Sequence, residues 1–197
     1  SAARAAIQAG ADPIKAIKLG LMPGLAEIEK RFEERRLPSL RPVSAEYAVR
    51  EARDLLISSL PESQRPPPAG RVVLGIAQGD PHSIGKMISK AMLCSRGFEV
   101  FDLGEDVKAE EFVKRAEELN ADVIAVGTLM LQCMITQKQV VEILDNKGLR
   151  DSHKVVIGGR PEIVTQEYAE EIGADACGFN ISDFANKIAK STAANRS

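Results

Sequence analysis

The chain has 197 residues, 44% of them hydrophobic and 27% charged, and its formal net charge is −2. This is the composition of a globular protein with a buried core, and the small net charge gives no general attraction to nucleic acid or to anionic membranes. Because no apolar run approaches the roughly 20 residues of a membrane-spanning helix, and no signal peptide is visible, we expect a cytoplasmic protein without a nucleic-acid or membrane partner.

Residues 1–60 are predicted to form a small helical-bundle domain. Gly10 is typical of a helix end, Asp12 followed by Pro13 is typical of a helix start, and Ser44 is a candidate N-cap. Apolar residues three or four positions apart define one face of a helix: Leu21, Leu25, Ile28 and Phe32. The expected helices are 2–10, 12–20, 21–36 and 44–60. The first helix looks cut short, which suggests that an upstream segment is missing.

Residues 61–70, with the sequence PESQRPPPAG, are predicted to form a linker. Three consecutive prolines can neither continue a helix nor supply the N–H groups of a strand, and they favour an extended, semi-rigid spacer. We therefore place a domain boundary here, with the helical domain at 1–60 and a second domain at 71–197.

The second region alternates between strand-like and helix-like patterns. The expected strands are 71–77, 98–104, 121–128, 154–159 and 174–179. The expected helices are 83–97, 108–120, 137–148, 161–173 and 182–192, with Ser182 as the N-cap of the last. This alternation predicts an α/β fold, in which helices cover both faces of a parallel sheet. Five strands with right-handed crossovers favour the doubly wound, flavodoxin-like strand order 2-1-3-4-5.

Three short sequences are expected to meet at one crevice, because ligands of doubly wound sheets bind beyond the carboxyl ends of the strands. Asp80 and His82 follow the first strand, Thr128 ends the third, and Gly158-Gly159 ends the fourth. A carboxylate beside an imidazole can hold one ring nitrogen and make the other a better metal ligand or proton acceptor. The glycines leave room for a bulky group. The pattern therefore predicts a wide slot with one imidazole at its mouth, whose tautomer is fixed by the neighbouring carboxylate.

The same loops disfavour several common sites. The phosphate-binding patterns GxGxxG and GxxxxGK[ST] are absent. Receiver domains of this strand order carry an acidic pair after the first strand and an aspartate after the third, whereas Gln78-Gly79-Asp80 and Thr128 stand here. The three cysteines are far apart, so we expect reduced thiols and no zinc cluster. His153, in a polar connector, is expected to be exposed.

The crevice residues resemble the signature of cobalamin-binding domains, which consists of Asp-x-His-x-x-Gly, Ser-x-Leu and Gly-Gly. Its three parts read DPHSIG (80–85), TLM (128–130) and GG (158–159). Forty-two residues separate Gly85 from Thr128 and 27 separate Met130 from Gly158, gaps similar to those of the family. Residues 1–60 resemble the helical cap of corrinoid proteins in methylamine and methanol methyltransferase systems, so the resemblance covers nearly the whole chain.

The resemblance implies how a cofactor is held. In that family the cofactor's own benzimidazole leaves cobalt and enters the slot, and the histidine becomes the lower axial ligand, an arrangement called base-off/His-on. His82 would then ligate cobalt, Asp80 would hold its second ring nitrogen, and Thr128 would bond near the buried nucleotide tail. The implied cofactor-binding residues are Asp80, His82, Ser83, Ile84, Gly85, Thr128, Met130, Gly158 and Gly159.

Three departures from the family pattern leave the subfamily open. Thr128 replaces serine and keeps the hydroxyl, and Met130 replaces leucine at similar volume. Residues 131–134, LQCM, stand where methylamine and methanol members carry a run of threonines. This last change would leave the fold intact but alter the polar groups near the tail, which leaves the subfamily open.

The resemblance implies a corrinoid carrier protein. Its cobalamin, or a related corrinoid, would accept a methyl group from a substrate-specific methyltransferase. A second methyltransferase, with tetrahydrofolate or a thiol as acceptor, would then remove it, and a reductive activase is a third candidate partner. No residue resembles a general base or nucleophile for the donor, so the chain is expected to be a subunit without catalysis of its own. The alternatives are a cobalamin-dependent sensor or regulator, and the small subunit of an adenosylcobalamin-dependent isomerase.

Overall fold

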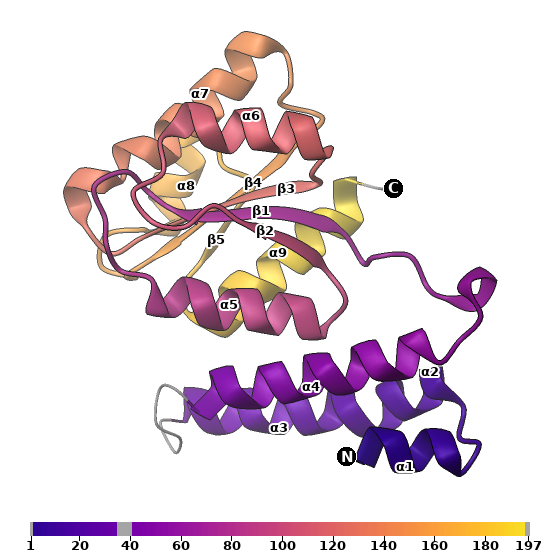
Figure 1. Cartoon of the computed structure of the whole chain (residues 1–197). Coiled ribbons are helices and arrows are strands. Elements are labelled where there is room, and N and C mark those ends of the chain that lie inside the picture. Colours follow the sequence, from indigo (N-terminus) through magenta and orange to yellow (C-terminus); the bar gives the residue numbers. More distant parts are fainter. Residues whose placement is uncertain (1, 35–40, 196–197) are drawn as a thin grey trace. The chain divides into compact units, whose positions relative to one another are not determined.

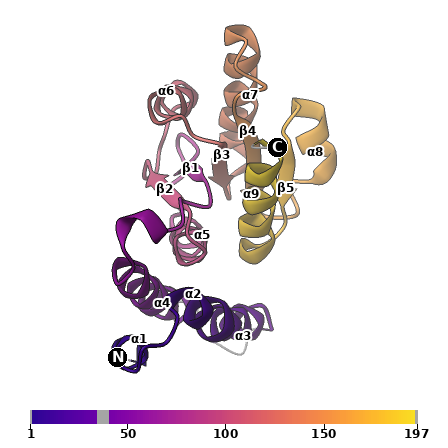
Figure 2. The same ribbon diagram turned by 90° about the vertical axis from the view of Figure 1, so that its right-hand side faces the viewer.

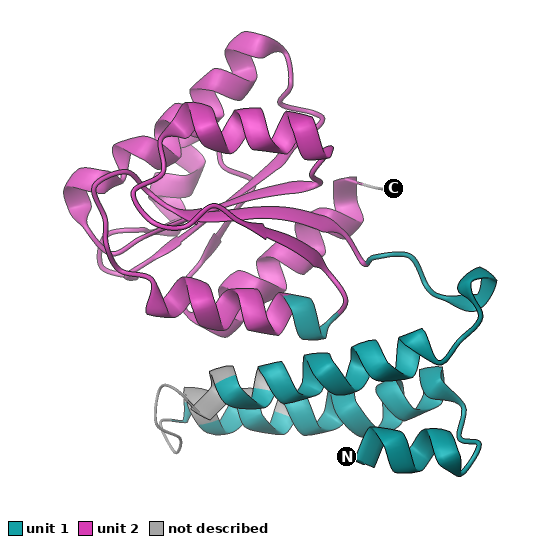
Figure 3. Cartoon of the chain, viewed as in Figure 1, with its two compact units in different colours: residues 1–68, 94–96 teal, residues 69–93, 97–197 magenta. Residues whose placement is uncertain are grey.

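The computed structural model of the chain describes residues 2–34 and 41–195 (Figure 1). The chain divides into two compact units, residues 1–68 with 94–96 and residues 69–93 with 97–197 (Figure 3). The domain limits 1–60, 61–70 and 71–197 stay a prediction of the sequence. Within the described ranges, no helix is both long and apolar enough to cross a membrane.

The first unit is helical. Its helices are α1 (Ala2–Gln8), α2 (Pro13–Ala16), α3 (Met22–Glu33) and α4 (Arg41–Ser58), with the short 3-10 helix η2 (Glu62–Gln64) after them. Asp12 caps α2 as predicted, because its Oδ1 accepts the N–H groups of Ile14 at 2.8 Å and Lys15 at 3.1 Å. Leu25 is buried as predicted, whereas the side chain of Phe32 lies outside the described part.

Two sequence predictions for this unit are wrong. The helices expected at 12–20 and 21–36 are joined by a π-helical turn, η1 (Ile17–Leu21), so that Gly20 does not end a helix. In this turn the Met22 N–H bonds to the Ile17 carbonyl, five residues back. The wider turn ends two residues before Pro23, which has no N–H to donate. Helix α4 begins at Arg41, so Ser44 lies inside it and is not its N-cap.

The second unit is the predicted α/β fold. Its strands are β1 (Arg71–Ile76), β2 (Glu99–Asp102), β3 (Val123–Thr128), β4 (Lys154–Gly159) and β5 (Ala176–Gly178). They form one parallel sheet in the predicted order β2-β1-β3-β4-β5. Its helices are α5 (Ile84–Ser95), α6 (Ala109–Leu119), α7 (Ile135–Lys147), α8 (Gln166–Ile172) and α9 (Ile181–Asn195), with the 3-10 helix η3 (Leu131–Cys133) before α7.

The helices cover both faces of the sheet. Helices α5 and α9 lie on one face, and α6, α7 and α8 lie on the other (Figures 1 and 2). The central strands β1, β3 and β4 are buried over most of their length, as their continuous apolar sequences predict. Thr128 pairs with Gly159, and Ile76 with Gly127, so the ends of these three strands meet at one edge.

Two further predictions in this unit are wrong. Helix α9 is capped by Asn180, whose Oδ1 accepts the Asp183 N–H at 2.8 Å, and Ser182 lies within the first turn. His153 is only 6% exposed, and its Nδ1 lies 2.7 Å from the Ala121 carbonyl oxygen. The connector before β4 looks polar in sequence, but this hydrogen bond satisfies the imidazole and lets it be buried.

Candidate functional site

The β1–α5 loop, residues 77–83, carries the predicted Asp80 and His82. It opens with a tight turn in which the Asp80 N–H bonds to the Ala77 carbonyl at 3.1 Å. Gly79 is the third residue of this turn and has φ of +84°, a conformation that side chains disfavour. The turn folds Asp80 back under the loop, where it is fully buried.

Asp80 and His82 form a hydrogen-bonded pair. The His82 Nδ1 lies 2.7 Å from the Asp80 Oδ1, and the His82 backbone N–H donates to the same oxygen at 3.0 Å. An ionised carboxylate only accepts hydrogen bonds, so Nδ1 carries the ring proton in this pair. The lone pair of the neutral imidazole is then on Nε2. The histidine side chain is 53% exposed, so that a ligand can reach it.

The second oxygen of Asp80 ties the pair to the end of β3. Asp80 Oδ2 accepts the Thr128 hydroxyl at 2.7 Å and the Leu129 N–H at 2.6 Å. Burial raises the pKa of Asp80, but the hydrogen bonds from His82, Leu129 and Thr128 outweigh burial and bring the pKa below its usual value. The carboxylate is therefore charged at neutral pH and fixes the tautomer of His82.

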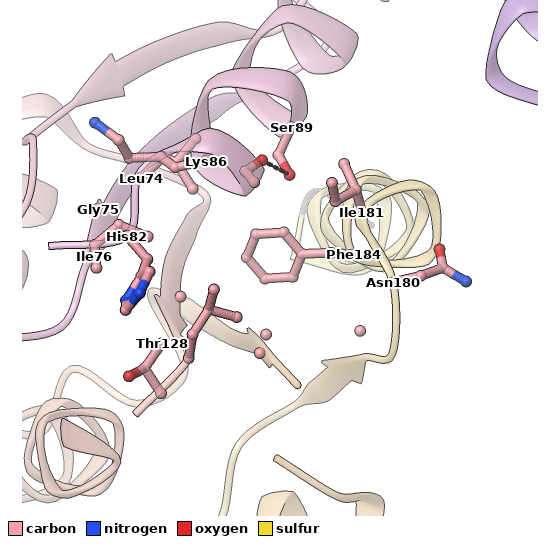
Figure 4. Close-up of a pocket in the computed structure, with 16 residues that line it drawn as sticks. Leu74, Gly75, Ile76, His82, Lys86, Ser89, Thr128, Asn180, Ile181 and Phe184 are labelled. Atoms are coloured by element: carbon pink, nitrogen blue, oxygen red, sulfur yellow. Dashed lines mark hydrogen bonds between the residues drawn. The ribbon is translucent and has the colours of Figure 1, made fainter. Parts of the chain in front are cut away.

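His82 stands at a cleft beside the carboxyl ends of the strands (Figure 4). The cleft holds about 570 Å³ of empty space, part of it open to solvent. Its walls come from β1, α5, the ends of β3 and β4, and the start of α9, and they are mainly apolar or glycine. The predicted residues among them are His82, Gly85, Thr128, Gly158 and Gly159.

The other predicted residues lie beside the cleft rather than in its wall. Asp80 is buried beneath the loop, Ser83 is the last residue of the loop, and Ile84, 56% exposed, begins α5. Met130 packs against the hydrophobic core of the α/β unit, and its neighbour Leu129 lines the cleft, 41% exposed.

Sequence reasoning missed the wall that α9 contributes. Asn180, Ile181 and Phe184 line the cleft, and the Phe184 ring projects into it from α9 (Figure 4). Helical periodicity could have placed Phe184 on the inner face of α9, but no motif linked that helix to the crevice. Lys86 and Ser89 of α5 also line the cleft and were not predicted.

The paired glycines of β4 are required by packing. A Cβ on Gly158 would lie 2.7 Å from the Phe184 ring. A Cβ on Gly159 would lie 2.3 Å from the Thr128 carbonyl oxygen and 2.5 Å from the Val164 side chain. Any side chain at Gly159 would therefore push β3 and β4 apart.

We predict that Gly159→Ala lowers the free energy of unfolding by about 3 kcal/mol, because the backbone oxygen of Thr128 cannot yield cheaply. The control is Gly85→Ala, whose Cβ would meet only the Ile181 side chain, at 4.0 Å. Since Gly85 lies inside α5, this variant should be as stable as the natural chain or about 0.5 kcal/mol more stable. Urea unfolding of both variants without cofactor is the measurement, and equal destabilisation would contradict the packing argument.

Comparison with known proteins identifies the fold and its ligand. Residues 70–181 match the B12 binding domain family. The chain is 40% identical over 172 residues to the dimethylamine corrinoid protein 1 of Methanosarcina acetivorans, covering 87% of this chain and 80% of that protein.

Two solved structures are similar over most of the chain. One is a cobalamin-binding protein from Desulfitobacterium hafniense, with a TM-score of 0.78 and 28% identity, covering 94% of this chain and 87% of that one. The other belongs to the methanol:cobalamin methyltransferase complex from Methanosarcina barkeri, with a TM-score of 0.70 and 29% identity, covering 93% of this chain and 69% of that one.

The family model covers more than half of the chain, and the methylamine relative matches both the helical and the α/β parts. The sequence signature, the strand order and the cleft agree with these matches. The chain belongs to the B12-binding corrinoid proteins associated with methyltransferases, and its cofactor is a corrinoid.

Proposed function

We propose that the chain is a methyl carrier that holds its corrinoid in the base-off/His-on state. The observation that carries the proposal is the Asp80–His82 pair at the mouth of the cleft, with the Nδ1–Oδ1 distance of 2.7 Å and Nε2 left for a metal. The names of the relatives, which are methylamine corrinoid proteins and a methanol:cobalamin methyltransferase complex, support the reaction class.

The residues present fit a corrinoid. Within residues 2–34 and 41–195, no group of three or more His, Cys, Asp or Glu side chains could hold a metal by itself. A single imidazole suits a metal whose other ligands come from a macrocycle. The apolar, glycine-rich cleft next to His82 suits the nucleotide tail, with Phe184 and Gly158 on one wall.

Each residue then has a defined task. His82 would hold cobalt through Nε2, and Asp80 would keep the Nδ1 proton in place. Thr128 and the Leu129 N–H orient Asp80 from the other side. Gly85 leaves the entrance of the cleft open. When bound, the cofactor supplies a cobalt centre that accepts and releases a methyl group.

The Asp80–His82 pair would also make the imidazole a better metal ligand. The hydrogen bond from Nδ1 to a buried, charged carboxylate increases the electron donation from Nε2. We propose as partners a substrate-specific methyltransferase, a second methyltransferase that acts on tetrahydrofolate or a thiol, and a reductive activase, all in the cytoplasm.

The test is methyl transfer with purified partners. The chain is reconstituted with hydroxocobalamin, reduced, and mixed with a methyltransferase specific for methanol, a methylamine, glycine betaine or an aryl methyl ether, each with its radiolabelled substrate. We expect label in the protein-bound cofactor with one of these donors. No labelling with any donor, together with a light-dependent change in oligomer size of the adenosylcobalamin complex, would instead favour a sensor.

A further inference from the structure

The residues Asp102–Asp106, here called the 102–106 segment, contact the loop that carries Asp80 and His82 and the helix α5 that follows it. The segment begins at the last residue of β2 and leads toward α6. None of its residues belongs to the cobalamin-binding signature. Its contacts come from three carboxylates. Asp106 accepts from Gly79 in the loop, and Asp102 and Glu105 pair with Lys86 in α5.

The backbone of the segment follows β1 and then bulges. The Leu103 N–H bonds to the Leu74 carbonyl at 2.9 Å, and Ile76 bonds to both Gly104 and Val107 at 3.0 Å. Glu105 and Asp106 therefore form an excursion opposite a single residue of β1. This fixes the segment to the strand from which the β1–α5 loop departs.

Asp106 sits in a conformation that side chains rarely adopt. Its φ is +57°, and Asn120, at the end of α6, is the only other non-glycine residue with positive φ in the described part of the chain. Such a conformation costs free energy and persists where other contacts enforce it. Here the Asp106 Oδ1 accepts the Gly79 N–H at 2.7 Å, directly before Asp80.

The second contact lies at the start of α5. The Lys86 Nζ lies 2.5 Å from the Asp102 Oδ1, with only 5% of the lysine side chain exposed. In Figure 4 the Lys86 nitrogen points away from Phe184. Lys90 and the Gly104 N–H also bond to Asp102, at 3.1 and 3.0 Å. Burial raises the pKa of Asp102, but the Lys86, Gly104 and Lys90 hydrogen bonds together lower it, so the carboxylate stays charged.

We propose that the 102–106 segment is a positioning element for His82: Asp106 holds the loop before Asp80, and Asp102 holds helix α5 after His82 through Lys86. The proposal rests on the proposed role of His82 as the cobalt ligand. A ligand carried on a loop must be held close to its bound geometry, or the binding energy is spent on ordering it. These two contacts restrain the loop on either side of the pair.

The test compares two substitutions of Asp106. Asp106→Gly accepts the positive φ and removes only the carboxylate, whereas Asp106→Asn tolerates that φ and keeps an oxygen that can accept the Gly79 N–H. In the protein without cofactor, we expect Asp106→Gly to speed hydrogen exchange of the Gly79 amide by about tenfold, and Asp106→Asn by less than about twofold.

The second readout is hydroxocobalamin binding. We expect Asp106→Gly to weaken binding in the histidine-bound state by about five- to tenfold, with recovery in Asp106→Asn. Lys86→Met, which keeps the buried chain but removes the charge, should weaken binding in the same direction, and it replaces Asp106→Gly should that variant not fold. Binding and amide exchange within about twofold of the natural chain in Asp106→Gly and Lys86→Met would overturn the inference.

His82→Ala separates this inference from the proposed function. If His82→Ala loses the histidine-bound spectrum while Asp106→Gly matches the natural chain in both readouts, His82 is the ligand and the positioning role fails. If His82→Ala leaves the spectrum unchanged, His82 is not the cobalt ligand, and the segment cannot act on cobalt through it. The exchange rate of the Gly79 amide still decides whether Asp106 holds the loop.

Discussion

Replacing His82 with alanine is expected to abolish the histidine-bound absorption spectrum of the chain reconstituted with hydroxocobalamin. Among the described residues that line the cleft, His82 is the one whose ring nitrogen bonds to a buried carboxylate, which leaves the other nitrogen for a metal. Without it, the chain would offer no imidazole to the metal at this position, and water or the cofactor's own base would take its place. We also expect the affinity for hydroxocobalamin to fall more than about tenfold, because the axial bond is lost.

The matched control is His153→Gln, since the chain has two histidines. His153 is buried and its Nδ1 contacts the Ala121 carbonyl oxygen, so this variant should lose some stability but keep the natural spectrum. Absorption spectra of the natural chain and both variants at saturating cofactor are the measurement. A natural spectrum in His82→Ala would refute the assignment of the ligand.

Replacing Asp80 with alanine is expected to lower both the stability of the chain and its affinity for the cofactor. This fully buried carboxylate accepts hydrogen bonds from His82, Thr128 and Leu129. Its removal leaves the Leu129 N–H and the Thr128 hydroxyl without their shortest acceptor, and each unsatisfied buried group costs about 1–3 kcal/mol. We expect the free energy of unfolding to fall by about 3 kcal/mol, and hydroxocobalamin affinity to fall about ten- to a hundredfold.

Thr128→Ser is the control for Asp80→Ala, because serine keeps the hydroxyl that donates to Asp80 and should cost less than about 1.5 kcal/mol. The two variants are compared by urea unfolding without cofactor and by titration with hydroxocobalamin. An Asp80→Ala protein as stable as Thr128→Ser would mean that the hydrogen bonds to Asp80 do not hold the loop.

The pH dependence of stability has a definite sign at this site. The pKa of Asp80 lies below its usual value in the folded chain and returns to about 3.9 on unfolding. The contribution of the charged Asp80 to the free energy of unfolding is therefore fully present above the pKa of the unfolded chain. It is lost as the pH falls through the pKa of the folded chain. In Asp80→Asn, the free energy of unfolding should therefore fall less steeply below about pH 4 than in the natural chain. Part of the fall should remain, because the pKa of Asp102 is also lowered in the folded chain.

The sequence predicted those parts of the structure that depend on local chemistry. The strand order was predicted from the alternation of strand and helix patterns, together with the right-handed crossovers of such sheets. The position of Asp80 and His82 was predicted because their motif lies between the apolar pattern of β1 and the helical pattern of α5. Asp12 was predicted as an N-cap from its residue type and from Pro13 after it, and its partners Ile14 and Lys15 lie only two and three positions further on.

The features that were missed depend on tertiary contacts. Phe184 reaches the cleft only because α9 packs closely on β5, where a Cβ on Gly178 would lie 2.4 Å from the Phe184 Cα. The contact of Asp106 with Gly79 joins residues 27 positions apart through a bulge that no periodicity indicates. Burial of His153 likewise depends on the distant Ala121 carbonyl. Ser182 has the residue type of an N-cap, but Asn180 lies where the chain actually turns into α9.

The close packing around Gly158 and Gly159 has an evolutionary consequence. Both glycines are needed by the apoprotein, since a methyl group there would collide with Phe184 or with the Thr128 carbonyl. A homologue that no longer binds a corrinoid would still need both glycines for packing. It would not need the half-exposed imidazole of His82 for packing. Among diverged homologues, the histidine rather than the glycine pair would therefore distinguish proteins that still bind a corrinoid from proteins that have lost this function.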